Sequence, residues 1–298
     1  MTYATDHKSH GAYAASPIRR FADSRARLLA PLSDRTYLCS SRMKSDAGGK
    51  LTAITAYLDE LLDIPTFPDY PGAFNGLQLE NSGRVKKIGA AVDSGLKVIE
   101  QAIGEGVDLL VVHHGLFWSG SAPISGPSYR KLAKAIGADL AVYSAHLPLD
   151  AHPEIGNNVL LAAELGLKGV EPFFEFKGRP VGCCAQVDIP FASLLAKIEQ
   201  RFGRQAWHCD AGPERTRKVG IVTGGAGSEL VQVKAQGIDT FITGEGPHHT
   251  FTLAEELGMN LVYAGHYATE TAGVKALADR VANRFELPWV FLDHPSGL

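Results

Sequence analysis

Three histidines and two acidic residues follow short apolar segments of the chain, where side chains can be brought together for chemistry. His113 and His114 come after the run LLVV, Asp150 ends an H-x-x-x-D motif, and His266 and Glu270 form an H-x-x-x-E motif. Imidazoles and carboxylates together suit Zn²⁺, Mn²⁺, Fe²⁺ or Ni²⁺ better than Mg²⁺ or Ca²⁺, which prefer oxygen alone. The sequence therefore predicts a transition-metal site.

The number of donors favours two ions over one. Five donors exceed the three or four protein ligands of an ordinary zinc site, and paired ions typically lie about 3.5–4 Å apart with a bridging carboxylate. Asp150 could supply that bridge. Glu270 is expected in the first turn of a helix, where the helix dipole favours negative charge. His146, within the H-x-x-x-D motif, could ligate a metal or orient a ligand by a hydrogen bond.

Taken alone, each motif has a plainer interpretation, as a surface loop or a charge at a helix start. Three further features are weaker still. The glycine-rich turn TGGAGS (223–228) could cradle a phosphate or simply turn the chain. His248 and His249 could support the site or lie on the surface. Phe117 and Trp118 could stack on a base or pack into the protein.

The elements that must position these residues alternate between strands and helices. A helical pattern starts at Leu51, and residues 86–93, 94–106 and 107–115 read as a strand, a helix and a strand. Further helices are expected near residues 157 and 269. This alternation predicts an α/β fold. Open α/β sheets bind ligands beyond the carboxyl ends of their strands, which is where the motifs would lie.

An internal repeat suggests that the chain consists of two similar halves. Residues 87–115 align without a gap with residues 218–246, and VYSAHLPLD (142–150) matches VYAGHYATE (262–270). In the second half, Gly244 and Glu245 replace the histidine pair. We therefore expect two similar interlocked α/β lobes related by internal duplication, residues 50–170 and 171–298, with the metal site at strand C-terminal ends between them.

Composition excludes some classes of protein and favours others. The chain has 298 residues, 45% of them hydrophobic, and a formal charge of −3. No apolar run is long enough to span a membrane, so we expect a soluble, cytoplasmic protein. The negative charge beyond residue 49 argues against nucleic-acid binding. The four cysteines form no C-x-x-C pair and are expected to be reduced, buried thiols.

The first 49 residues differ from the rest. They carry eight Lys and Arg against four Asp and Glu, are rich in Ser and Ala, and lack sustained periodicity. Residues 1–49 are therefore predicted to be a disordered tail. An organelle transit peptide, or an upstream start codon with Met43 as the true beginning, would look similar.

The motifs as a set resemble those of the Nif-three-like family of dinuclear-metal-centre proteins, the GTP cyclohydrolase 1 type 2 homologues. The resemblance covers about residues 50–298 and is carried by NGLQLE (75–80), VVHHGLFWSG (111–120), HLPLDAHPEIGNN (146–158), FITGE (241–245), GHYATE (265–270) and FLDHP (291–295). It implies a two-lobed fold, metal ligands at His113, His114, Asp150, His266 and Glu270, and a toroidal homohexamer. His146 would lie outside this ligand set.

The resemblance implies a metal-dependent hydrolase that acts on a nucleotide, in the manner suggested by the name GTP cyclohydrolase 1 type 2. Two alternatives stay open: a non-catalytic metal-handling or regulatory protein, and a two-metal phosphoesterase. The sequence lacks a P-loop, which excludes only that manner of holding a nucleotide. The uncharged apolar loop 115–124 is a candidate for the subunit interface of a hexamer, or for packing within the chain.

Overall fold

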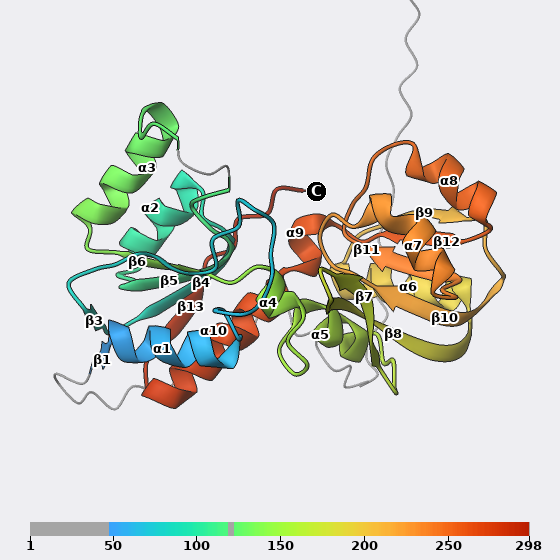
Figure 1. The fold of residues 1–298 in the computed structure, drawn as a ribbon, viewed down its shortest axis with the longest axis horizontal. Helices are drawn as coiled ribbons and strands as arrows, with labels where there is room; N and C mark the ends of the chain where they lie inside the picture. The colour runs from blue at the N-terminus through green and yellow to red at the C-terminus, as the bar shows by residue number, and fades with distance from the viewer. Residues whose placement is uncertain (1–47, 119–121, 298) are drawn as a thin grey trace, which may run out of the picture. The chain divides into compact units, whose positions relative to one another are not determined.

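Two larger β-sheets carry most of the structure, a computed structural model that describes residues 48–118 and 122–297 (Figure 1). The described residues fall within one compact unit of the chain. The predicted tail lies outside the described residues up to residue 47. Its last residue differs from the prediction, because Gly49 belongs to strand β1 (Gly49–Lys50) and pairs with Val85 of β3 (Arg84–Val85). Gly49 therefore belongs to the fold and not to the tail.

The first sheet has five strands, four of them parallel. Its spatial order is β13 (Trp289–Phe291), β4 (Ile88–Asp93), β5 (Leu109–His114), β6 (Ala141–Ser144) and β2 (Gly76–Leu79), with β2 antiparallel at the edge. Helices α1 (Leu51–Leu61) and α10 (Thr271–Phe285) cover one face, and α2 (Leu96–Gly104) and α3 (Gly126–Gly137) cover the other (Figure 1).

The sequence of β4 explains why both faces are covered. Ile88, Ala90 and Val92 pack into the core under α1 and α10, while Ala91 packs into the core under α2. Successive side chains of a strand point to opposite faces, so a strand that is apolar at every position must be buried on both sides. The predicted strand, helix and strand of residues 86–115 are confirmed as β4, α2 and β5.

The second sheet has six strands and the same layered plan. Its order is β7 (Glu171–Phe176), β8 (Arg179–Pro190), β10 (Arg215–Ile221), β11 (Thr240–Thr243), β12 (Asn260–Tyr263) and β9 (Trp207–Asp210), with β10, β11 and β12 parallel. Helices α5 (Asn157–Glu164) and α6 (Phe191–Phe202) cover one face, and η2 (Gly227–Glu229) leads into α7 (Leu230–Ala235), which with α8 (Thr250–Leu257) covers the other.

The two segments of the internal repeat fold alike. Residues 87–115 form β4, α2 and β5, and residues 218–246 include the end of β10, then α7 and β11, with the two strands parallel in each case. The third parallel strands, β6 and β12, follow in corresponding positions of the two sheets. Their common origin by duplication stays a prediction.

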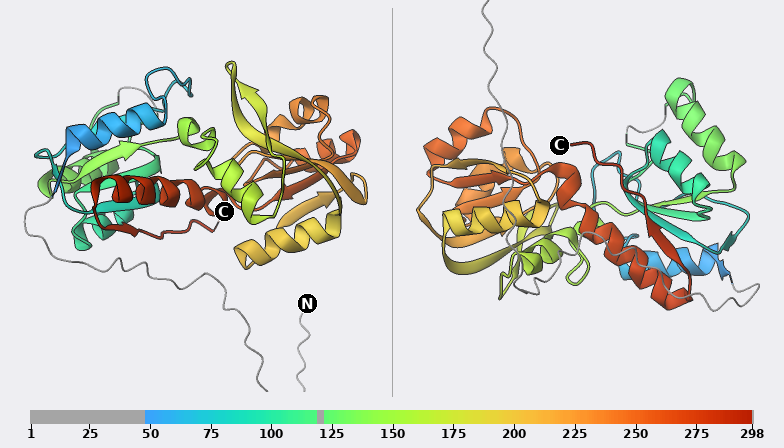
Figure 2. Two further views of the ribbon diagram at one scale, coloured as in Figure 1. Left: turned by 90° about the horizontal axis from the view of Figure 1, so that it is seen from below. Right: turned by 180° about the vertical axis from the view of Figure 1, so that it is seen from behind.

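The expected boundary between residues 170 and 171 does not coincide with the division between the sheets. Strand β13 pairs with β4, and Val274, Leu277 and Val281 of α10 lie in the core of the first sheet. Figure 2 shows α10, in red, lying along this sheet beside α1, in blue. The apolar side of α10 finds its partners there, so the C-terminal segment returns to the first sheet and interlocks the two halves.

Two smaller expectations can be compared with the structure. Cys183, Cys184 and Cys209 are buried and unpaired, as expected for reduced thiols, and burial raises the pKa of Cys183 to about 12. Cys39 lies outside the described residues. Among the helices that the structure describes, none combines the length and apolar character that a membrane crossing requires.

Candidate metal centre

The predicted ligands meet where strands of both sheets end. His113 and His114 are the last residues of β5. Asp150 ends the short helix α4 (Leu147–Asp150) after β6. His266 begins the short helix α9 (His266–Thr269) after β12, and Glu270 joins α9 to α10. Glu270 therefore stands just before α10, and not in the first helical turn where the sequence predicted it. The placement follows the rule that α/β sheets gather ligands at the carboxyl ends of strands.

His113 lies at the closed end of the cluster, with its side chain fully buried. Its Nδ1 lies 2.9 Å from the carbonyl oxygen of Ala145. A carbonyl only accepts hydrogen bonds, so Nδ1 carries the proton and donates. Nε2 lies 3.5 Å from Oδ2 of Asp150 and 3.4 Å from Oε1 of Glu270. The lone pair of Nε2 therefore faces two carboxylates.

His114 and His266 are held in the same way by carboxylates. Nδ1 of His114 lies 2.9 Å from Oδ1 of Asp93, and Nδ1 of His266 lies 2.9 Å from Oε1 of Glu245. Metal-binding histidines commonly donate their other ring N–H to such an acceptor, which sets the tautomer and the ring orientation. In both residues Nε2 is left to bind a cation.

Glu270 is the common neighbour of all three rings. Its Oε1 lies 3.4 Å from Nε2 of His113 and 3.2 Å from Nε2 of His266, and its Oε2 lies 3.4 Å from Nε2 of His114. Donor atoms bonded to one ion at about 2.0–2.2 Å lie roughly 3.0–3.4 Å apart. The nitrogen and oxygen atoms are therefore spaced as ligands of a cation would be.

Asp150 is placed to bind on one side only. Its Oδ1 accepts hydrogen bonds from Nδ2 of Asn157 at 2.8 Å and from Oγ1 of Thr223 at 3.3 Å, while Oδ2 faces His113. The expectation that Asp150 bridges two cations therefore does not fit this geometry, because one of its oxygens is already engaged. Glu270, with both oxygens facing imidazoles, is better placed for that role.

Two buried polar atoms in the cluster lack a hydrogen-bond partner: Nε2 of His113 and Oε2 of Glu270. Buried polar groups are nearly always satisfied, because leaving one without a partner costs about 1–3 kcal/mol. A cation bound between these atoms would satisfy both. The His/Glu cluster could therefore hold a metal ion, and His114, His266 and Glu270 have ligand atoms within 4.8 Å of one another.

The electrostatics of the cluster also call for positive charge. Burial alone would lower the pKa of His113, but the charges of Asp150 and Glu270 outweigh it and hold the pKa well above its ordinary value. Burial likewise opposes protonation of His266, but Glu270 and Glu245 raise its pKa to about 9. Burial would raise the pKa of Glu270, yet the facing histidines hold it well below the usual range. Buried carboxylates favour positive charge on their neighbours, and a divalent cation would supply it instead of protons.

Three residues that orient the rings were missed by the sequence reasoning. Asp93, Glu245 and Asp69 accept hydrogen bonds from Nδ1 of His114, His266 and His146, respectively. Asp93 and Glu245 each end or follow a strand beside a ligand strand, so a strand-end carboxylate in each repeat could have marked them. Asp69 lies in a proline-rich loop, and no periodic pattern points to it.

The weaker candidates have separate outcomes. In the turn 223–228, Gly224 has a φ of +72° and lies against the Glu270 carboxylate, so this turn forms a wall of the cluster. His248 and His249 are exposed. The indole of Trp118 packs edge-on against the ring of His146 at 4.9 Å and donates from Nε1 to the carbonyl of Gly115. Residues 119–121 of the apolar loop lie outside the described residues.

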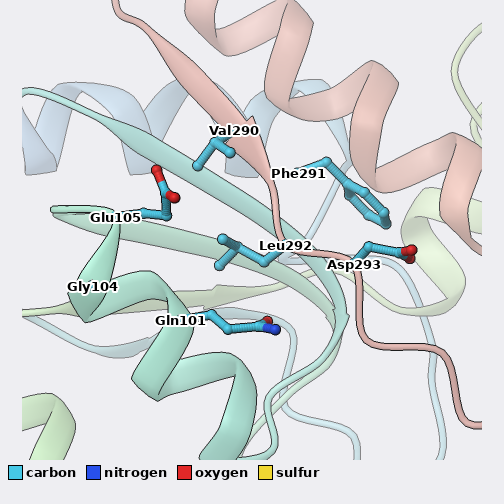
Figure 3. A pocket seen from close by; sticks show the side chains of 7 residues that line it. All are labelled: Gln101, Gly104, Glu105, Val290, Phe291, Leu292 and Asp293. Atoms are coloured by element: carbon cyan, nitrogen blue, oxygen red, sulfur yellow. The ribbon is translucent and has the colours of Figure 1, made fainter. Parts of the chain in front are cut away.

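A surface pocket of about 390 Å³ lies elsewhere, between α2 and the strand β13 (Figure 3). Its lining includes Gln101, Glu105 and Asp293 but none of the predicted ligands. Its residues do not include a histidine or cysteine, which are the usual ligands of transition metals. The chemistry is therefore assigned to the histidine cluster.

Comparisons with known proteins identify relatives of this chain. The family model described as Duf34/NIF3 (NGG1p interacting factor 3) matches residues 49–296. A GTP cyclohydrolase 1 type 2 homolog from Deinococcus radiodurans is 38% identical over 247 residues, covering 82% of this chain and 93% of that protein. The homolog of the same name from Escherichia coli K12 is 37% identical over 252 residues, covering 83% and 99%. The crystal structure of TTHA1606 from Thermus thermophilus is 42% identical, with a TM-score of 0.77 over 84% of this chain and 100% of that chain.

Removing a predicted ligand should weaken metal binding. Glu270→Ala and His113→Ala should each lower metal affinity at least tenfold, because each removes a donor at the centre of the cluster. The control is His208→Ala, which removes an exposed histidine on β9. Elemental analysis after dialysis against a weak chelator measures the outcome. Full metal content in both ligand variants would show that the cluster is not the metal site.

The close approach of Gly224 to Glu270 allows a test without removing any ligand. A Cβ at position 224 would collide with the Glu270 carboxylate, whereas Gly237, also at positive φ (+78°), has open space around it. Each glycine-to-alanine change should cost about 1–2 kcal/mol of stability through backbone strain. Only Gly224→Ala should also lower metal affinity. Equal metal binding by the two variants would contradict the close contact.

Proposed function

Since the chain belongs to the Duf34/NIF3 family, we propose that it is a dinuclear metal-binding protein that acts as a metal-dependent hydrolase on a nucleotide. The proposal for two ions is carried by a single observation, the position of the Glu270 carboxylate between two groups of donors. His113, Asp150 and Glu270 form one group through their 3.4–3.5 Å contacts. His114, His266 and Glu270 form the other. A carboxylate shared in this way is the usual bridge of a two-metal site.

The donor types indicate which ions would bind. Each group combines imidazole nitrogen with carboxylate oxygen, a mixture that suits Zn²⁺, Mn²⁺, Fe²⁺ or Ni²⁺. When bound, such a pair supplies acidified water and a Lewis acid for hydrolysis. The chain's own contribution is to hold the ligands in place: Asp93, Glu245 and the Ala145 carbonyl keep the three Nδ1–H groups engaged. Asn157 keeps Asp150 facing His113.

The nucleotide substrate is supported by the names of the relatives, which are called GTP cyclohydrolase 1 type 2 homologs. The site adds that both carboxylates are directed at histidines and not at the solvent, so a bound ligand would meet a cationic centre once metals are present. That charge suits the phosphates of a nucleotide. A cyclohydrolase would direct water to a carbon of the purine ring and open the ring. A phosphoesterase would direct water to a phosphorus atom.

The test uses the full chain loaded with each of the four metals. Wild type should bind close to two ions per chain and should convert GTP with loss of the purine absorbance. Phosphate release is measured in parallel to detect a phosphoesterase. Asp150→Ala should reduce turnover by a factor of about a hundred or more, because one ion loses a ligand, while His208→Ala should match wild type.

The outcomes separate the alternatives. Phosphate release without a change in the purine would favour a phosphoesterase. Two bound ions without turnover of any nucleotide in a panel would contradict the hydrolase and would favour a metal-handling protein. A single ion per chain would contradict the dinuclear centre.

We also propose that the chain assembles as a homohexamer, as the family resemblance implies. A closed ring needs repeated contacts that bury apolar surface on every chain. Ile124 is 63% exposed and belongs to the candidate interface loop, whereas Trp118 is 38% exposed and packs on the site histidines. Light scattering should therefore give a mass near six chains for wild type and a lower mass for Ile124→Glu. A monomeric wild type at micromolar concentration would refute this assembly.

A further inference from the structure

Asp69 and His146 form a buried pair that neither donor group uses. Oδ1 of Asp69 accepts hydrogen bonds from Nδ1 of His146 at 2.9 Å and from the backbone of Tyr70 at 2.6 Å. Its Oδ2 accepts from Nδ2 of Asn75 at 2.8 Å and from the backbone of Leu147 at 3.1 Å. Asn75 in turn accepts a hydrogen bond from the backbone of His146 at 2.7 Å. The loop thus holds the imidazole of His146 in one orientation.

The carboxylate of Asp69 acts as an acceptor throughout this network. It accepts from two backbone N–H groups and from Nδ2 of Asn75, all of which can only donate. The proton of the neutral imidazole of His146 therefore lies on Nδ1, which faces this carboxylate. In that tautomer Nε2 of His146 is a hydrogen-bond acceptor. His113, His114 and His266 are held in the same tautomer by their own acceptors.

His146 lies beside the histidine pair of the cluster. Its ring lies 5.0 Å from that of His113 and 5.8 Å from that of His114, and the three residues have ligand atoms within 4.8 Å of one another. Its side chain is 12% exposed, which lies between the completely buried His113 and His114 at 19%. Trp118 packs edge-on against its other side. The ring is therefore fixed beside the histidine pair, within reach of a ligand bound there.

His146 differs from the other three rings in one respect. In the described part of the chain, the ion pairs of Asp150 and Glu270 with histidines involve His113, His114 and His266, and His146 pairs with Asp69 instead. Neither Asp150 nor Glu270 therefore forms an ion pair with His146. Its free nitrogen is directed toward the centre without belonging to either group.

We propose that His146 positions the bound ligand, and that its Nε2 accepts a hydrogen bond from a proton-bearing oxygen or nitrogen of a ligand bound at the metal centre. Asp69 acts through His146 by fixing its tautomer. This inference rests on the proposed metal centre and deepens it by naming a substrate class. The substrate presents an O–H or N–H group to His146 while its neighbouring atoms face the metals.

Two dianions provide matched probes for this acceptor. At mildly alkaline pH, inorganic phosphate is mainly the monohydrogen ion, which carries one proton, and sulfate carries none. The two ions share their charge and tetrahedral shape, but phosphate is the more basic metal ligand, so the test depends on how each affinity changes in the variants. A site that offers an acceptor favours the ion that can donate, because the other ion would leave the acceptor without a partner.

The experiment compares phosphate and sulfate binding to the metal-loaded full chain by calorimetry. Wild type should bind phosphate more tightly than sulfate. His146→Ala should weaken phosphate binding roughly tenfold while it leaves sulfate binding and metal content unchanged. Asp69→Asn should weaken phosphate binding by a smaller factor, because the ring stays in place but loses its charged acceptor. His208→Ala is the matched histidine control and should behave as wild type.

The failures of this inference and of the proposed function are distinguishable. A wild type without bound metal would defeat the proposed function before any anion is added. With full metal content, equal affinities of wild type for the two anions, or equal losses of both in His146→Ala, would overturn the positioning role. A lower metal content in His146→Ala would overturn it in a different way, by showing that His146 is itself a ligand.

Discussion

A carboxylate buried to 2% exposure requires compensating positive charge, and the structure around Glu270 is arranged to meet that requirement. Three imidazoles lie 3.2–3.4 Å from its two oxygens, and they come from both sheets. The neighbouring carboxylates raise the pKa values of His113 and His266, which shows that the cluster favours positive charge on these rings. The partnerless Oε2 of Glu270 and Nε2 of His113 show that these contacts alone do not complete the site. A divalent cation answers both needs.

The position of Glu270 depends on how the chain passes between the sheets. Glu270 joins α9, which follows a strand of the second sheet, to α10, which packs on the first. The start of α10 is tied to the site by Asn157, whose Oδ1 accepts a hydrogen bond from the backbone of Gly273 at 2.7 Å and whose Nδ2 donates to Asp150. A side chain at Gly273 would collide with Asn157. The crossing that interlocks the halves therefore also sets the separation of the two carboxylates that face His113.

The four histidines of the cluster are all oriented by the same kind of hydrogen bond. Four rings in the cluster give Nδ1 to an acceptor, and in each case the partner lies at least 21 residues away in the sequence. This arrangement directs each Nε2 toward the same region before any ion binds. The rings therefore lose little rotational freedom when an ion binds. The similar treatment of His146, which is not in the predicted ligand set, is what marks it as part of the working site.

The α/β class, the strands and helix of residues 86–115 and the types of donor could be predicted from the sequence, because apolar periodicity and strand-end motifs are local properties. The sequence also located the helix starting at Leu51 and the helix at Asn157. The placement of Glu270, and not Asp150, between the histidines of both donor groups is visible only in the folded chain. It depends on the approach of Asn157 and Thr223 to one oxygen of Asp150. Only the tertiary structure also decided that Asp93, Glu245 and Asp69 orient the rings and that β13 joins the first sheet. These contacts join residues far apart in the chain, and no local pattern records which distant side chains will meet.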